Sequence, residues 1–266
     1  MNAHAKRLIT GIVGAPVLIA IICYGSQLLF SILITGAILV GTLEYASMVL
    51  RHNERVEKVE LVIVALLIPI AFYLGNVELA LAVVVFAFMT IFAIHLIRIS
   101  ADNFTIIPPM KVLFGIIYIP LTMSYFLLLR TESIEFVLLV LVIAMVGDAS
   151  AFYVGKTWGK TKIYPMISPN KSAEGLFAIP VGALIGALIF RFLFMNHIPW
   201  YHIAIIAILG SLLGHIGDFC ESMIKRTNNT KDSGTILPGH GGILDRIDCL
   251  IFIVPFVYYY KMVFMR

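Results

Sequence analysis

Three aspartates stand out as candidate catalytic residues. Asp218, Asp245 and Asp248 lie in the densest polar segment of the chain, residues 217–248. Each borders a long apolar stretch, where an isolated carboxylate is costly and therefore indicates a functional site. Asp245 and Asp248 are three residues apart, so they would share one face of a continuous helix. On a second helix, Asp218 would share a face with Ser222 and Lys225.

Two such helices could aim carboxylates at each other across a polar pocket. Acidic groups that close repel one another unless a cation lies between them. Mg²⁺ suits this position, because it takes oxygen ligands and often completes its shell with substrate phosphates. The logic of two-metal sites allows a second cation. The residues expected to bind metal are Asp218, Asp245, Asp248 and Asp148.

Glycines and basic residues in the same segment suit a polyphosphate. The stretch 238–242 reads Pro-Gly-His-Gly-Gly and directly precedes the last apolar stretch. Small residues let a backbone approach a ligand, and the first amides of a helix bind phosphate well. Basic side chains would neutralise the phosphate charge. Those in or beside the segment are Lys225, Arg226, Lys231 and Arg246.

A second polar loop, residues 155–175, follows Asp148. It resembles a phosphate-binding P-loop, but the spacing is one residue short and Val154 stands where the first glycine belongs, which excludes that motif. Lys171 and the hydroxyl of Ser172 are candidates to contact a phosphate instead. The alternative interpretation is an ordinary interfacial loop whose lysines follow the positive-inside rule.

Several other features are expected to be structural. Gly182 with Gly186, and Gly210 with Gly214, have the G-x-x-x-G spacing that lets helices pack closely. His215 is expected to pack beside the aspartates without binding a ligand. Glu44 is expected to reach the membrane interface.

The composition identifies a membrane protein. Of the 266 residues, 61% are hydrophobic and 13% are charged, whereas soluble domains carry about 25% charged residues. The excess apolar surface must face lipid. The net charge of +4 is explained by basic loops and implies no nucleic-acid partner.

The hydropathy pattern predicts an all-α fold with about nine transmembrane helices. A helix needs about 20 apolar residues to cross the membrane and satisfies its own backbone there. We expect one membrane domain over residues 1–266, with residues 1–140 mainly as scaffold and residues 141–250 carrying the catalytic helices and loops. The expected helices are 8–24, 28–49, 59–75, 79–97, 112–129, 134–154, 176–195, 201–220 and 243–263.

The distribution of basic residues predicts the topology. With the N-terminus in the cytoplasm, 15 of the 19 Lys and Arg residues fall in cytoplasmic segments and 4 fall outside. That asymmetry obeys the positive-inside rule. It places both polar loops, and hence the active site, on the cytoplasmic side of the inner (plasma) membrane, and the C-terminus outside.

The polar segment resembles the signature of the CDP-diacylglycerol synthases, also called phosphatidate cytidylyltransferases. The resemblance rests on the fixed spacing of Ser222, Lys225-Arg226, Lys231-Asp232, Pro238 to Gly242, and Asp245-Arg-Ile-Asp248. The loop from Ser168 to Gly175 is also similar to that family. Three positions depart from the family pattern: Cys249 replaces a serine, and Asn170 and Ser172 stand where Lys and Thr are common. None of these is a carboxylate.

This resemblance implies the reaction and its participants. A phosphate oxygen of phosphatidate attacks the α-phosphorus of CTP and pyrophosphate leaves, in a Mg²⁺-dependent, dimeric membrane enzyme of phospholipid biosynthesis. The implied catalytic residues are Asp218, Asp245, Asp248, Lys225 and Arg226. The implied substrate-binding residues are Lys171, Ser172, Ser222, Lys231, Asp232, His240, Gly241, Gly242 and Arg246.

Other functions fit the sequence less well. The CDP-alcohol phosphotransferase motif fails, because Cys249 stands where that motif requires glycine. A CTP-dependent lipid kinase stays open and would release CDP. A secondary transporter would place its charges near the membrane midplane, whereas here they gather at one face and no inverted repeat is visible.

The charge asymmetry generates a topology prediction. A reporter fused after Arg266 should report an outside location, and a reporter inserted between residues 226 and 232 should report a cytoplasmic one. The measurement is a paired reporter-activity assay in cells. Both reporters on the same side would contradict the nine-helix topology.

Overall fold

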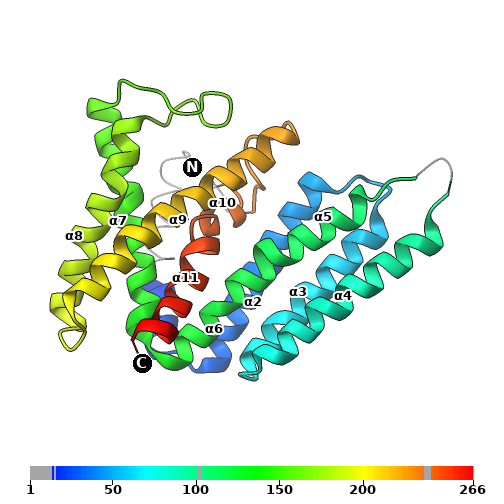
Figure 1. Cartoon of the computed structure of the whole chain (residues 1–266), viewed down its shortest axis with the longest axis horizontal. Coiled ribbons are helices and arrows are strands. Elements are labelled where there is room, and N and C mark those ends of the chain that lie inside the picture. Colours follow the sequence, from blue (N-terminus) through cyan, green and yellow to red (C-terminus); the bar gives the residue numbers. More distant parts are fainter. Residues whose placement is uncertain (1–13, 15, 101–103, 237–240, 266) are drawn as a thin grey trace. The chain divides into compact units, whose positions relative to one another are not determined.

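The computed structural model describes residues 14, 16–100, 104–236 and 241–265. Helices dominate this part of the chain, and Figure 1 shows no strand in it. It contains an isolated antiparallel β-bridge between Lys162 and Ser172. The all-α prediction is therefore confirmed for the described residues.

The chain forms two compact units. The first comprises Met1–Leu128 and Asp232–Arg246, and the second comprises Leu129–Lys231 and Ile247–Arg266. The segment 232–246 belongs to the first unit. The expected division of one membrane domain into scaffold and catalytic parts near residue 140 stays a prediction.

The first unit is built from the earlier helices. Between α5 and α6 the chain makes a π-helical turn, η2, which contains Pro120. Proline has no backbone N–H, so it breaks the regular pattern of helical hydrogen bonds. The hydroxyl of Ser124 donates to the carbonyl oxygen of Pro120 at 2.5 Å, which satisfies an oxygen at the irregular turn. The elements are α2 (Gln27–Val49), α3 (Arg55–Tyr73), α4 (Val77–Arg98), α5 (Ile107–Ile116), η2 (Ile117–Leu121) and the start of α6 (Thr122–Glu132).

The second unit holds the two longest α-helices of the described residues, Ile134–Trp158 and Trp200–Thr227. Its principal elements are α7 (Ile134–Trp158), α8 (Ala173–Phe194), α9 (Trp200–Thr227) and α11 (Leu250–Phe264). The short α10 (Leu244–Ile247) lies where the chain passes from the first unit to the second.

Seven helical stretches of the described chain are long and apolar enough to cross a membrane, so the protein is a multi-pass membrane protein. They are Gln27–Val49, Val77–Arg98, Ile107–Glu132, Ile134–Trp158, Ala173–Phe194, Trp200–Thr227 and Leu244–Phe264.

The predicted count of nine is not reached, for two reasons. The first expected helix, 8–24, lies partly outside the described residues, which lack 8–13 and 15. The third forms as α3 but starts with Arg55, Glu57, Lys58 and Glu60, and it is not among the seven. Nine transmembrane helices therefore stay a prediction.

The helix α4 shows why these elements need lipid. Its buried residues are Ala80, Ala87 and Ile91. Large apolar side chains elsewhere on it are exposed, including Phe86 at 64% and Phe88 at 50%. A helix that is apolar on all sides and largely uncovered by protein is expected to face hydrocarbon.

The last predicted helix forms over Leu244–Phe264, but a turn at Asp248 and Cys249 interrupts it, so Asp245 and Asp248 do not lie on one continuous helix. α10 ends at Ile247 and α11 begins at Leu250. Between them, Asp248 Oδ1 accepts a hydrogen bond from the backbone N–H of Cys249 at 2.7 Å. Aspartate side chains compete in this way for amides that a regular helix would use.

The G-x-x-x-G pairs pack helices closely, as predicted. A Cβ added at Gly186 in α8 would lie 3.0 Å from Val146 Cγ2 in α7. A Cβ added at Gly214 in α9 would lie 2.6 Å from Ile253 Cδ1 in α11. The missing side chains let the helices of the second unit approach one another.

This packing generates a stability prediction. Gly186→Val should overfill the α7–α8 contact and destabilise the protein by roughly 1–3 kcal/mol, seen as a lower midpoint of thermal unfolding in detergent. Adding Val146→Ala should recover part of the loss. Gly36→Val in α2 is the control, because nothing lies within 4 Å of a Cβ there. Equal losses in both single variants, or no recovery with Val146→Ala, would contradict the packing assignment.

Candidate active site

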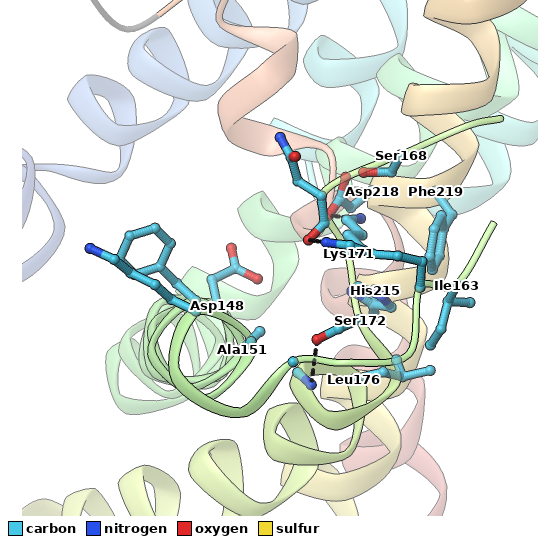
Figure 2. Close-up of a pocket in the computed structure, with 17 residues that line it drawn as sticks. Asp148, Ala151, Ile163, Ser168, Lys171, Ser172, Leu176, His215, Asp218 and Phe219 are labelled. Carbon is cyan, nitrogen blue, oxygen red and sulfur yellow. Dashed lines mark hydrogen bonds and ion pairs between the residues drawn. The ribbon is translucent and has the colours of Figure 1, made fainter. Parts of the chain in front are cut away.

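The second unit contains a pocket of about 690 Å³ that is lined by both charged and apolar side chains. Figure 2 shows side chains from the late part of α7, the loop before α8, the start of α8 and α9 around it. Its volume falls in the range of about 300–1,000 Å³ that is typical of small-molecule sites. The charged residues that line it are Asp148, Lys156, Lys162, Lys171 and Asp218.

An ion pair between Lys171 and Asp218 lies in this pocket. Lys171 Nζ lies 2.5 Å from Asp218 Oδ2 and 4.1 Å from the centre of the Phe219 ring. The Ser222 hydroxyl donates to Asp218 Oδ1 at 3.4 Å, which fits the predicted shared helix face. The His215 ring packs edge-on against Phe219, with ring centres 4.6 Å apart, in agreement with the packing role expected for it.

Backbone hydrogen bonds within the loop before α8 position Lys171. The N–H of Ile163 donates to the carbonyl oxygen of Lys171 at 3.2 Å, and the N–H of Ala173 donates to that of Thr161 at 2.8 Å. The chain turns at Tyr164, whose φ is +49°. Lys171 thus projects from an ordered hairpin-like loop.

Ser172 is both a pocket residue and the N-cap of α8. Its Oγ accepts a hydrogen bond from the N–H of Gly175 at 3.2 Å, an arrangement typical of helix starts. A Cβ at Gly155 would lie 3.3 Å from this Oγ. The glycine therefore lets the C-terminal part of α7 approach the cap closely.

Two further aspartates accompany Asp218. The carboxylate of Asp148 points toward the pocket in Figure 2. Asp248 interacts electrostatically with both Asp218 and Asp148. Gly217 helps to bring them together, since a Cβ at this position would collide with the carbonyl oxygen of Asp248. Three of the four predicted metal ligands thus gather in the second unit.

These carboxylates match Mg²⁺ in donor chemistry, because the ion prefers oxygen ligands. In the described residues, no group of three or more His, Cys, Asp or Glu side chains is arranged to hold a metal ion. Mg²⁺ often uses one or two protein carboxylates and completes its shell with water and phosphate, so a preformed cage is not required. Metal binding stays a prediction.

Lys225 and Arg226, expected to be catalytic, have protein partners in the structure. Lys225 forms an ion pair with the fully buried side chain of Glu221, one turn earlier on α9, and interacts electrostatically with Asp248. Arg226 Nε donates to the carbonyl oxygen of Ile167 at 3.2 Å, which ties the end of α9 to the hairpin-like loop. Their catalytic roles stay predictions.

Other predicted site residues lie in the first unit. Asp245 Oδ2 accepts hydrogen bonds from the backbone N–H groups of Ser233 at 3.1 Å and Gly242 at 2.9 Å. Gly241 has φ of +83°, a conformation that side chains rarely adopt. Asp232 is exposed.

The remaining predicted substrate-binding residues are Lys231, Arg246 and His240. Lys231, in the second unit, and Arg246, in the first, are both exposed. His240 lies outside the described residues.

Glu44 was missed by the sequence reasoning. The expectation was a carboxylate at the membrane interface, but only 5% of this residue is exposed. Its oxygens bind Ser233, Ile243 and Leu244, all within the first unit. An acidic residue inside an apolar stretch was the available signal, yet its partners are about 190–200 positions away.

Comparison with known proteins agrees with the signature. A model of the cytidylyltransferase family matches residues 5–264. The chain is 41% identical over 146 residues to a phosphatidate cytidylyltransferase of Bacillus subtilis. It is 34% identical over 157 residues to one of Staphylococcus epidermidis and 37% identical over 162 residues to one of Staphylococcus aureus.

These matches to relatives cover part of each chain. The matched region is 54% of this chain and 54% of the Bacillus protein. For both Staphylococcus proteins it is 59% of this chain and 60% of the relative. The chain therefore spans little more than half the length of the curated relatives that it matches.

Proposed function

This chain belongs to the cytidylyltransferase family, and from that premise we propose that it transfers the cytidylyl group of CTP to phosphatidate. The products would be CDP-diacylglycerol, a precursor for phospholipid biosynthesis, and pyrophosphate. Relatives at 34–41% identity carry the name of this activity. The substrates of the present chain are inferred from theirs together with its own residues.

The observation that carries the proposal is the charge pattern of the pocket. Three lysines and two aspartates line a single cavity. Lys171 belongs to the loop that resembles the synthase family, and Asp218 lies four residues before the signature that begins at Ser222. Lysines can neutralise a triphosphate, while carboxylates can hold the cation that accompanies it.

The reaction needs positioning and charge neutralisation more than covalent participation by the protein. A phosphate oxygen of phosphatidate forms a bond to the α-phosphorus of CTP. The bond from that phosphorus to the bridging oxygen breaks, and its electron pair leaves with pyrophosphate. Lys171 would exchange its partner Asp218 for a phosphate oxygen, which frees the carboxylate. Ser172, at the start of α8, would border the same phosphates.

A bound Mg²⁺ ion would neutralise charge that develops on the phosphate oxygens. Asp218, Asp248 and Asp148 are the residues of the second unit that would hold it, and the sequence adds Asp245 to this set. A second cation stays compatible with the proposal.

The cellular setting is part of the proposal. A lipid substrate requires a site open to the bilayer, and CTP requires access from the cytoplasm. We therefore place the site at the cytoplasmic face of the inner (plasma) membrane, in a nine-helix topology with the C-terminus outside. We also expect a homodimer, as the family resemblance implies.

Isotope labelling tests the reaction directly. With purified protein, phosphatidate and Mg²⁺, label in the α-phosphate of CTP should enter the lipid, and the β- and γ-phosphates should leave together as pyrophosphate. Chromatography of the lipid and aqueous phases measures both. Release of CDP with γ-label in the lipid would instead identify a kinase.

Single substitutions test the carboxylates. Asp218→Asn, Asp245→Asn and Asp248→Asn should each lower turnover by roughly 10²–10³-fold, because each removes a preorganised charge at the reacting centre. Their effects should be non-additive, since residues that act as a unit fail together. The folded state should survive, because the loss of one carboxylate relieves mutual repulsion.

The measurement is turnover against Mg²⁺ concentration, with a melting curve for each variant. Glu132→Gln is the control, because it breaks the ion pair of Glu132 with Lys261, which does not line the pocket. Purely structural ion pairs would give the reverse pattern, a stability loss of about 3–5 kcal/mol with normal turnover in the surviving protein. Near-normal turnover in folded Asp248→Asn would sink the assignment.

A further inference from the structure

Glu44 of α2 is a buried carboxylate that accepts hydrogen bonds from the segment 232–246. Its Oε1 accepts from the backbone N–H of Ile243 at 3.1 Å. Its Oε2 accepts from the N–H of Leu244 at 2.8 Å and from the hydroxyl of Ser233 at 3.1 Å. Glu44, which is 5% exposed, thus binds Ser233 near the start of the segment and Ile243 and Leu244 near its end.

Asp245 makes further hydrogen bonds within the same segment. Asp245 Oδ2 accepts from the N–H groups of Ser233 and Gly242, and the N–H of Asp245 donates to Ser233 Oγ at 3.3 Å. Ser233 therefore connects the two carboxylates, since its hydroxyl contacts both Glu44 and the backbone of Asp245. Moving Glu44 would disturb Asp245 through this shared residue.

Glycines in the segment leave room for Glu44. A Cβ at Gly234 would meet Cγ, Cδ and Oε1 of Glu44, and a Cβ at Gly242 would lie 2.5 Å from its Oε2. These two positions are therefore shaped around the carboxylate. The need for space around Glu44 therefore accounts for the glycines at positions 234 and 242, and no bound ligand has to be invoked for them.

A general stabilising role would not account for this arrangement as well. Burying a carboxylate is costly unless charge-assisted hydrogen bonds compensate it. Elsewhere in the first unit, Glu57 is equally buried at 5% exposed and is compensated by an arginine, Arg98, at 2.8 Å. Glu44 instead uses its oxygens on the backbone and hydroxyl groups that precede and surround Asp245.

We propose that Glu44 is a positioning residue, which holds Gly242 and Asp245 in the arrangement that the cytidylyl transfer requires. The inference rests on the proposed function, and it adds a residue of the N-terminal helices to a motif that lies 200 positions later. Partners that orient a functional group typically contribute about 10–100-fold to metal affinity or activity.

The test compares Glu44→Gln with Glu57→Gln in the full-length protein. Glutamine keeps the size of Glu44 but replaces one accepting oxygen with an N–H₂ group, which would face donors already present. Glu44→Gln should lower kcat by about 10–100-fold and raise the Mg²⁺ concentration needed for half-maximal rate. The KM for phosphatidate should stay unchanged. Glu57→Gln is matched in burial, chemistry and unit, and should leave all three quantities near the wild-type values.

A double-mutant cycle then separates positioning from general stability. Ser233→Ala and Glu44→Gln should be non-additive in kcat, because they break one network, whereas Ser233→Ala and Glu57→Gln should add. Glu44→Asp, which keeps the charge, should recover part of the rate lost in Glu44→Gln. Gly234→Ala should reproduce the Glu44→Gln defect by displacing the carboxylate. If Glu44→Gln does not fold, Ser233→Ala and Gly234→Ala carry the test.

The outcomes are distinguishable from a failure of the proposed function. An inactive wild-type protein would contradict cytidylyl transfer itself. An active wild-type protein with equal rates for Glu44→Gln and Glu57→Gln would overturn the positioning role. So would a Glu44→Gln defect confined to the melting temperature, with kcat and the Mg²⁺ requirement unchanged.

Discussion

The cost of placing a carboxylate in a largely apolar chain governs the described structure. Such a group must be paired or accept several hydrogen bonds, because water is scarce around membrane helices. Asp218, Glu44 and Asp245 are stabilised by different partners. Asp218 has a lysine, Glu44 has two amides and a hydroxyl, and Asp245 has two amides.

These different partners separate Asp218 from Glu44 in function. The partner of Asp218 is Lys171, which lies on a loop that lines the pocket. A lysine side chain has several rotatable bonds, so a phosphate could displace Asp218 as its partner. The partners of Glu44 are backbone groups, which cannot leave without rearranging the chain. The first arrangement suits a group that must change partners during a reaction, and the second suits one that must keep its neighbours in place.

Close helix packing supports the pocket in the second unit. Gly214 and Gly217 on α9 let α11 and the turn at Asp248 approach, while Gly186 does the same between α8 and α7. The aspartates are therefore held by elements that cannot easily separate. Exposed apolar side chains, such as those on α4, are stable in contact with lipid. The polar residues can therefore lie in the interior site.

Hydropathy was enough to predict most of the helices, because twenty apolar residues have few alternatives in a membrane. It could not predict the break at Asp248, which depends on one side chain capturing the N–H of Cys249. The sequence named Asp148 and Asp218 as metal ligands because both border polar loops, and both line one pocket, while metal binding itself stays a prediction. The role of Glu44 could not follow from sequence, because its partners are fixed by tertiary contacts that no local pattern encodes.

A structure of the protein with Mg²⁺ and a non-hydrolysable CTP analogue tests the central claim most directly. The account predicts that the triphosphate lies in the pocket lined by Asp148, Lys171 and Asp218, with Lys171 bound to a phosphate oxygen and no longer to Asp218. A nucleotide bound elsewhere, or in this pocket with the Lys171–Asp218 ion pair intact, would contradict it.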